Sequence, residues 1–191
     1  MKGIHIFLAD GFEDMEALAT RDVLLRGGVP VVTVSITDEY LVESSHGLQV
    51  TADTSWADLE VMEPGTGPED VMIFPGGMPG SKNLAADKAL MALMRKCYAN
   101  GGVVAAICAA PGLVLSQLDD KDLSGRHFTC FEGFQDFLID KGAVYDPVGA
   151  VVDGRIVTGR GAGHAVGFGL AILGVLKDEE TVQRVRGGLM L

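Results

Sequence analysis

Short apolar runs alternate with helical patterns along the sequence, and this alternation constrains the fold more than any other feature. Six segments show it most clearly, in the order strand, helix, strand, strand, helix, strand: GIHIFLA (3–9), FEDMEALATRDVLLRGG (12–28), VPVVTVSI (29–36), DVMIFPGG (70–77), DKALMALMRKCYANGG (87–102) and VVAAIC (103–108). The Gly27-Gly28 pair is a typical helix end. Parallel neighbouring strands need crossover connections, so we expect a mostly parallel sheet with helices on both faces, a three-layer flavodoxin-like α/β/α sandwich.

The other segments add elements around this sheet. The stretch LVESSHGLQVTADTSW (41–56) has no helical period and a turn at His46-Gly47, which predicts two short strands on an edge, followed by a loop at 63–70. The remaining expected elements are a helix at 110–118, a strand at 126–130, a helix at 134–142, a hairpin at 150–159 that turns at Asp153-Gly154, and helices at 164–178 and 179–187.

Composition limits the class of protein. With 191 residues, 48% of them hydrophobic, and no repeat or low-complexity linker, the chain is expected to form a single domain over 1–191. A net charge of −11 argues against nucleic acid or an anionic membrane as a partner. The longest apolar stretch, 164–176, is shorter than the roughly 20 residues that span a bilayer. The N-terminus does not resemble a signal peptide and no CxxC pair occurs, so we expect a cytoplasmic protein with free thiols.

One cysteine, Cys108, stands where a buried strand ends and a helix is expected to begin. Ala106 and Ala110 lie two residues away on either side, as the small residues of a nucleophile elbow do. A helix starting at about Ala109 would present unpaired N–H groups to the sulfur and lower its pKa. The alternative is that Cys108 fills space as a small buried hydrophobe.

Two further features are expected at the same sheet edge. Gly76-Gly77 ends another buried strand and leaves bare backbone N–H groups that suit an oxyanion. Glu16, in the first helical segment, is in register with Phe12 and Val23, which predicts a buried carboxyl group with a raised pKa that remains protonated beside the thiol. A competing apolar stripe on that helix runs through Met15 and Leu18.

No cofactor or metal is expected. The segment around Lys82 does not match the Walker pattern, and GRGAGHAVG (159–167) does not match G-x-G-x-x-G, so a phosphate loop or a dinucleotide site has little support. The histidines His5, His127 and His164 have no partner pattern and are interpreted as structural.

Four motifs in order resemble the ThiJ/PfpI superfamily, and within it the branch of the parkinsonism-associated deglycase (glyoxalase III-like) and its bacterial relatives. They are GFEDMEAL (11–18), FPGGMPGSKNL (74–84), AAICAAPGLVL (105–115) and VTGRGAGHAVGFGLAIL (157–173), and the resemblance covers nearly the whole chain. It implies a class I glutamine amidotransferase-like fold, a homodimer, and no cofactor.

The resemblance also implies roles for single residues. Cys108 would be the nucleophile, Glu16 its protonated partner, and the N–H groups of Gly77 and Ala109 the oxyanion site, with Gly76 lining the pocket. In the family's dimers an arginine from the end of the first helix lies near the pocket, which matches Arg26.

This chain departs from its relatives at three positions. His46 stands where a second pocket arginine is common, and Phe131 where relatives often carry a histidine near the cysteine. Ala109 follows Cys108, whereas the amidase and protease branch has a histidine there, which weakens a peptidase interpretation.

Two functions remain open on these residues. The first is an enzyme in which Cys108 attacks a small aldehyde or a glycated substrate and Glu16 shuttles the proton, in a glyoxalase-type or deglycase-type reaction. The second is an oxidative-stress sensor in which oxidation of Cys108 switches a binding or chaperone-like role. Cysteine amidase activity is a weaker third, and the thiamine-biosynthesis label attached to some relatives has no phosphate-binding signature here.

Overall fold

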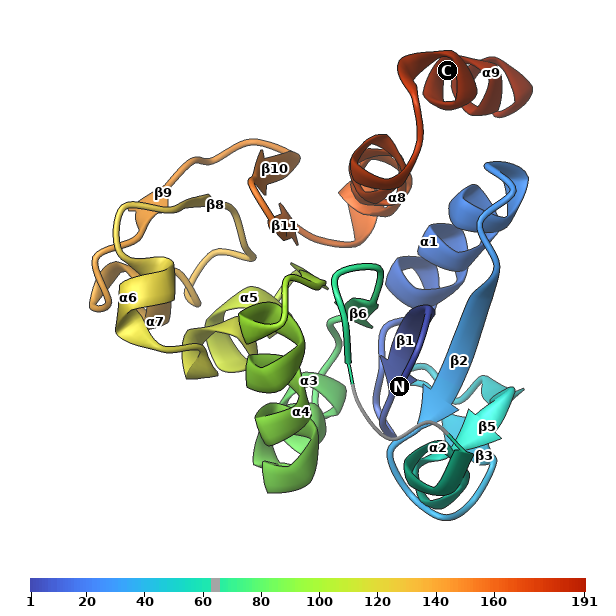
Figure 1. Cartoon of the computed structure of the whole chain (residues 1–191). Helices are drawn as coiled ribbons and strands as arrows, with labels where there is room; N and C mark the ends of the chain where they lie inside the picture. The colour runs from blue at the N-terminus through green and yellow to red at the C-terminus, as the bar shows by residue number, and fades with distance from the viewer. Residues whose placement is uncertain (63–65) are drawn as a thin grey trace.

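A seven-stranded sheet lies at the centre of the computed structural model, which describes residues 1–62 and 66–191 (Figure 1). In spatial order its strands are β10 (Ala150–Asp153), β11 (Ile156–Gly159), β7 (Val103–Ile107), β6 (Val71–Phe74), β1 (Ile4–Leu8), β2 (Val31–Ser35) and β5 (Thr54–Ser55). Only the β10–β11 pair is antiparallel among the pairs of this sheet in the described ranges. The expected mostly parallel sheet is confirmed.

Helices cover both faces of the sheet (Figure 1). One face is covered by α1 (Asp14–Arg26), α8 (Ala165–Leu176) and α9 (Glu179–Gly188). The opposite face carries α2 (Trp56–Met62), α3 (Gly80–Ala86), α4 (Lys88–Ala99), α5 (Ala110–Leu113), α6 (Asp120–Leu123) and α7 (Asp136–Ile139). This is the three-layer α/β/α sandwich expected from the sequence.

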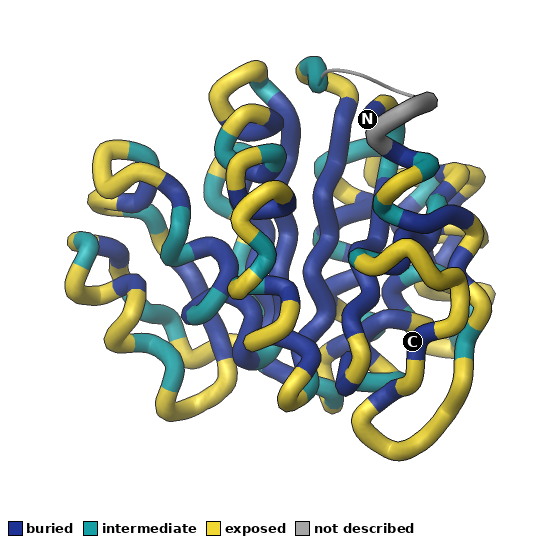
Figure 2. Tube along the Cα trace, turned by 90° about the horizontal axis from the view of Figure 1, so that it is seen from below, coloured by how far each residue is buried: buried dark blue, intermediate teal, exposed yellow. Residues whose placement is uncertain are grey.

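The core has two halves because alternate side chains of each strand point to opposite faces. In β1, Ile6 and Leu8 pack toward α1 and α8, while Phe7 packs on the other face. There Phe7 stacks on Phe74 of β6 with ring centroids 5.6 Å apart. Figure 2 shows the result, with the strands buried at the centre and the exposed segments around the periphery.

The hairpin expected at 41–56 forms as β3 (Leu41–Glu43) and β4 (Gln49–Thr51), with His46-Gly47 in its turn. It is not on an edge of the central sheet, as the sequence suggested, because its two strands pair only with each other among the described strands. Instead it attaches to the loop after β1, where the Gly11 N–H donates to the Glu43 carbonyl at 2.7 Å. Of the loop expected at 63–70, residues 63–65 lie outside the described part of the chain.

The segment after Cys108 is less helical than expected. Only α5, four residues long, and a 3₁₀ turn at Leu115–Gln117 replace the helix expected at 110–118. Within α5, Gly112 packs directly on the backbone of Phe134, so no side chain fits at that position. The strand expected at 126–130 is shorter, and it pairs as β8 (His127–Phe128) with β9 (Val144–Tyr145) outside the central sheet.

Smaller differences concern boundaries. Helices α2 and α3 were not predicted, and the helix expected at 134–142 is only the four-residue α7. The hairpin at 150–159 turns one residue later than predicted, because Asp153 still pairs with Ile156 and Gly154 adopts a φ of +60°. No helix in the described ranges is long and apolar enough to cross a membrane.

Candidate active site

The carboxyl ends of β1, β6 and β7 meet at one edge of the sheet, and the chain order reverses between β1 and β6. From β1 the chain moves outward to β2, and it later returns to form β6 on the other side of β1. In open α/β sheets this switch point is where ligands bind. The segments that follow these three strands carry Glu16, in the first turn of α1, Gly76-Gly77 and Cys108.

Cys108 adopts a strained backbone conformation directly after β7. Its φ is +66°, a left-handed value that costs a non-glycine residue about 1–3 kcal/mol. Two hydrogen bonds hold this conformation: its N–H donates to the Gly159 carbonyl at 2.9 Å, and its carbonyl accepts the N–H of Phe131 at 2.8 Å. The sharp strand-to-helix turn predicted from the small neighbours of Cys108 is therefore present.

Glu16 is buried, with only 1% of the residue exposed. It lies on the core side of α1 with Ala17, Thr20 and Val23, whereas Met15 and Leu18 are exposed. The sequence allowed two apolar stripes on this helix, one through Glu16 and one through Met15 and Leu18. The stripe through Glu16 faces the core.

Gly76 lies between the carboxyl group of Glu16 and the thiol. Its N–H donates to Oε2 of Glu16 at 2.7 Å. A Cβ added at Gly76 would overlap that oxygen and would approach Sγ of Cys108 to 3.1 Å. Because Gly76 has no side chain, the carboxyl group of Glu16 and the thiol of Cys108 can approach each other. This agrees with the predicted place of Gly76 in the pocket.

Burial controls the charge of Glu16. Loss of hydration raises the pKa of its carboxyl group to about 7, and the nearby Glu13 carboxylate adds to that rise. The N–H of Gly76 acts in the opposite direction because it stabilises the anion. A group with this pKa exchanges its proton near neutral pH, as expected for the proton carrier.

The pKa of Cys108 changes in the direction opposite to the one predicted. Burial, followed by repulsion from the Glu16 carboxylate, raises the pKa of the thiol to about 12. The N–H groups of Ala109 and Gly77 hydrogen-bond to the sulfur and lower its pKa, but they do not outweigh these effects. The short α5 also provides little of the helix dipole that the prediction relied on.

Backbone contact between two loops sets the position of Glu16. Gly77, with a φ of +93°, packs on the carbonyl oxygen of Gly11, and a Cβ there would also lie 2.5 Å from the nitrogen of Glu13. A Cβ at Gly80 would lie 2.6 Å from the carbonyl carbon of Gly11. The loop after β1 and the loop after β6 therefore fit together only where these residues are glycines.

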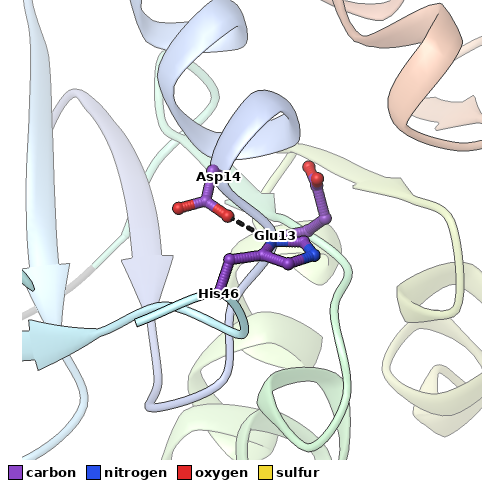
Figure 3. A group of neighbouring side chains, drawn as sticks. All are labelled: Glu13, Asp14 and His46. Atoms are coloured by element: carbon purple, nitrogen blue, oxygen red, sulfur yellow. Dashed lines mark hydrogen bonds and ion pairs between the residues drawn. The ribbon is translucent and has the colours of Figure 1, made fainter. Parts of the chain in front are cut away.

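His46 lies beside the start of α1 but does not reach Cys108 by any hydrogen bond in the described ranges. Its Nδ1 is 2.6 Å from Oδ2 of Asp14, in the group that Figure 3 shows with Glu13. Hydrogen bonds from Ser44 and from His46 hold the pKa of Asp14 below its ordinary value.

The Glu13, Asp14 and His46 side chains offer ligand atoms within 4.8 Å of one another. Those atoms are already in use, since Glu13 accepts the N–H of Glu16 and Asp14 binds His46. The partial positive charge of the helix N-terminus also opposes a cation. We therefore assign this group to hydrogen bonding, not to a metal.

Phe131 borders a pocket of about 690 Å³ that is lined by residues 131–132 and 160–164 and not by Cys108. The side chain is 51% exposed, and its backbone is the one that hydrogen-bonds to Cys108. Arg160 and His164 line the same pocket, and Arg160 pairs with Glu132 at 2.6 Å. Sequence reasoning missed Arg160, although its position directly after Gly159, the last residue of the strand beside β7, places it at this edge.

Two other predicted residues lie elsewhere. Arg26 ends α1 and pairs with Asp22 at 2.6 Å, about 15 Å from Glu16 by helical rise, so it does not lie beside Glu16 and Cys108. His127 bonds Asp146 at 2.8 Å through Nδ1.

Comparison with known proteins identifies relatives. The model of the DJ-1/PfpI family matches residues 2–174. "Protein dj-1beta" of Drosophila melanogaster is 32% identical over 190 residues, which cover 100% of this chain and 97% of that protein. "Glutathione-independent glyoxalase DJR-1.2" of Caenorhabditis elegans is 29% identical over 168 residues, covering 88% and 84%. Among solved structures, "Toxoplasma gondii DJ-1, oxidized" superimposes with a TM-score of 0.86 at 29% identity, covering 98% and 97%.

Proposed function

Since the chain belongs to the DJ-1/PfpI (ThiJ/PfpI) family, we propose that it is an enzyme acting on small reactive carbonyl compounds, with Cys108 as the nucleophile and Glu16 as the proton carrier. The resemblance recognised in the four sequence motifs is thereby confirmed. A relative that is 29% identical is named as a glutathione-independent glyoxalase, which supports a 2-oxoaldehyde as the substrate class.

One observation carries the proposal. Glu16 and Cys108 approach each other around Gly76, and the N–H groups of Gly77 and Ala109 hydrogen-bond to the sulfur. A carbonyl carbon attacked by Sγ would place its oxygen near these donors, which suits an oxyanion. The acid, the nucleophile and the donors that the chemistry needs are at one place.

The proposed reaction begins when Sγ adds to the aldehyde carbon of a 2-oxoaldehyde and the thiol proton passes through Glu16 to the former carbonyl oxygen. Glu16 then removes the hydrogen of that carbon as a proton and delivers it to the neighbouring carbonyl carbon, while the proton of the new hydroxyl group passes to the oxygen of that neighbouring carbon. The product is a thioester of a 2-hydroxy acid, and water cleaves it to the free acid and the thiol. One substrate carbon is oxidised while its neighbour is reduced, so no cofactor takes part.

The raised pKa of Cys108 determines how the first step is catalysed. The sulfur is a thiol near neutral pH, so it must lose its proton as the S–C bond forms. Glu16, with a pKa of about 7, is ionised in part of the molecules at neutral pH and can accept that proton. Glu16 therefore acts as the general base of the first step. The sequence had instead predicted a protonated Glu16 beside a sulfur that is already ionised. In an early glycation adduct, a hemiaminal, Sγ would instead displace the amine: the S–C bond forms, the C–N bond breaks, and the thiol proton passes through Glu16 to the leaving amine.

Lactate formation from methylglyoxal tests the proposal. We expect turnover by the wild type, none by Cys108→Ala, and a loss of at least about 100-fold in Glu16→Gln. Cys130→Ala is the matched control, because Cys130 is a buried thiol close in sequence to Phe131, and it should keep its activity. Turnover by Cys108→Ala would refute the assignment of the nucleophile.

A peroxide-responsive thiol is the second candidate. A structural relative is described as oxidized, and the N–H groups of Gly77 and Ala109 would donate hydrogen bonds to the oxygens of an oxidised sulfur. Intact mass after mild peroxide separates the two functions. A two-oxygen adduct on Cys108 in a protein without turnover would favour the sensor, and turnover without such an adduct favours the enzyme.

We also propose a homodimer built on α1, in a cytoplasmic protein. The outer side of α1 exposes Met15, Leu18 and Leu25, an apolar stripe at helical spacing that composition alone did not reveal. A second chain on this stripe would cover it. The same contact would give Arg26 of one chain access to the site of the other.

A further inference from the structure

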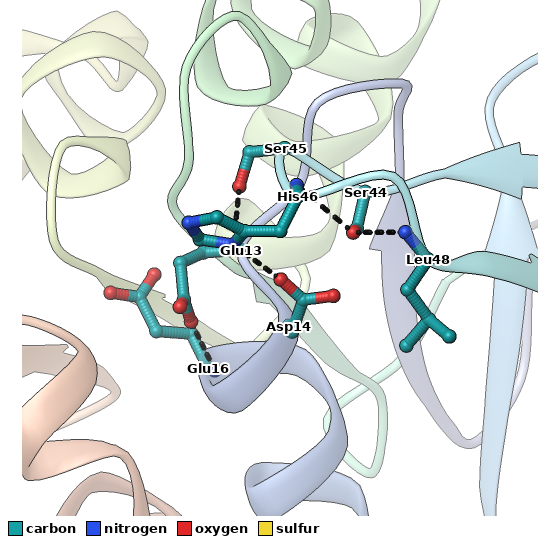
Figure 4. Close-up of polar contacts among 7 residues, drawn as sticks. All are labelled: Glu13, Asp14, Glu16, Ser44, Ser45, His46 and Leu48. Atoms are coloured by element: carbon teal, nitrogen blue, oxygen red, sulfur yellow. Dashed lines mark hydrogen bonds and ion pairs between the residues drawn. The ribbon is translucent and has the colours of Figure 1, made fainter.

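Three hydrogen bonds connect Glu13, Glu16 and Gly76 in a closed ring. The N–H of Glu13 donates to the Gly76 carbonyl at 3.0 Å, and the N–H of Gly76 donates to Oε2 of Glu16 at 2.7 Å. The N–H of Glu16 donates in turn to Oε2 of Glu13 at 2.8 Å, as Figure 4 shows. Glu13 thus holds the backbone of Glu16 through its carboxylate and the peptide of Gly76 through its N–H, and that Gly76 peptide in turn holds the carboxyl group of Glu16.

Helix capping alone does not explain a glutamate at position 13. Glu13 is the N-cap of α1, although serine, threonine, asparagine and aspartate are the preferred residues there. Asp14, which has a preferred side chain, is the next residue and binds His46 instead. The longer Glu13 side chain brings its carboxylate to the buried Glu16.

The charged groups around Glu16 are few. Cys108 faces it from the end of β7, and the loop after β6 contributes backbone N–H groups. Helix α8, which packs along α1, has no charged residue between 165 and 176. Asp14 and His46 form their own pair nearer the hairpin (Figure 4). The Glu13 carboxylate is therefore the charged side chain placed to repel a proton-free Glu16.

We propose that Glu13 is a positioning residue for the reaction, which orients Glu16 through the hydrogen-bond ring and strengthens the Glu16 carboxylate as a base by like-charge repulsion. The inference rests on the proposed function, since it assigns Glu13 a role in the proton transfer of Glu16. It is supported by the direction in which Glu13 changes the pKa of Glu16, which is upward.

The test is a ¹³C NMR titration of the Glu16 carboxyl carbon, assigned by its loss in Glu16→Gln. Glu13→Gln keeps an oxygen that can accept the N–H of Glu16 but removes the charge, and Glu13→Ala removes both. Asp14→Asn is the matched control, because it removes an acid from the same helix end that does not contact Glu16. Thermal denaturation of each variant reports the structural cost.

We expect the titration midpoint of Glu16 to fall by about 0.5–1 pH unit in Glu13→Gln, with a denaturation midpoint near that of the wild type, and to stay unchanged in Asp14→Asn. Glu13→Ala should also lose thermal stability. The inference is overturned when Glu13→Gln titrates like the wild type, because Glu13 is then only a cap. If Glu13→Ala does not fold, the titration midpoints of Glu16 in Glu13→Gln and Asp14→Asn still test the inference. The titration needs no substrate, so a wild type without turnover would refute the proposed function and leave this test intact.

Discussion

The N–H of Gly76 and Oε2 of Glu16 form a hydrogen bond of 2.7 Å between residues that are 60 positions apart in the sequence. The bond joins the loop after β6 to the first turn of α1, directly beside Cys108. The position of the Glu16 carboxyl group therefore depends on Gly76, a residue without a side chain.

Gly76→Ala should therefore abolish most activity. The added Cβ would overlap Oε2 of Glu16 and lie 2.5 Å from Cβ of Cys108, which moves the two groups apart. A displacement of about 1 Å typically costs about 100-fold in turnover, and we expect a loss of that size in methylglyoxal conversion. Gly167→Ala, on an open part of α8, is the control and should leave turnover unchanged. Full activity of Gly76→Ala would contradict the close approach seen here.

Glu16→Gln should stabilise the protein above neutral pH. The pKa of Glu16 is about 7 in the folded chain and about 4.5 when unfolded, so the folded state binds more protons between these values. Stability of the wild type therefore falls as pH rises through this window, by up to about 3 kcal/mol, and the variant is free of that loss. Urea unfolding at pH 5 and pH 8 measures it. Equal differences between variant and wild type at both pH values would contradict the raised pKa.

Alkylation of Cys108 should be slow at pH 7. With the thiol pKa raised to about 12, the thiolate fraction is small and grows about tenfold per pH unit between pH 8 and 10. The rate of modification by iodoacetamide, followed by intact mass, should rise accordingly, and Cys108→Ala corrects for the buried Cys97 and Cys130. A fast rate with a plateau near pH 7 would instead support the ionised sulfur predicted from the sequence.

Leu18→Glu should prevent dimer formation. Leu18 lies in the middle of the exposed stripe on α1, and a charge there would be buried without a partner in a dimer. Sedimentation velocity should show a dimer for the wild type and a monomer for the variant. Val148→Glu changes an exposed apolar residue away from α1 and should remain dimeric. A monomeric wild type would contradict the proposal for α1.

The main elements were predictable because their signals are local. The strands β1, β2, β6 and β7 each show as an apolar run, unlike the two-residue β5, and the helices α1 and α4 show a helical period with clear end signals. The sharp turn at Cys108 was predictable because Ala106 and Ala110, on either side of it, are small. Cys108 has a φ of +66° in this turn. Burial of Glu16 followed from its register with Phe12 and Val23, although only the structure excluded the competing stripe.

Features that depend on contacts distant in sequence could not be predicted. The raised pKa of Cys108 results first from burial of the thiol and then from the charge of Glu16. The sequence predicted Glu16 beside the thiol, but it did not show how deeply the surrounding chain buries the sulfur. Gly112 of α5 packs on Phe134, and the separate β8–β9 sheet depends on a pairing between segments 127–128 and 144–145. No pattern near either partner marks these contacts.

The meeting of Gly11 with Gly77 and Gly80 has a consequence for protein engineering. Main chain touches main chain there, so a library that randomises these positions should yield almost only inactive clones. Segments around the mouth of the site, such as the hairpin turn at His46 and the loop at Phe131, are exposed and tolerate new side chains more readily. Directed evolution toward new aldehydes should therefore begin at that rim and leave the glycine junction untouched.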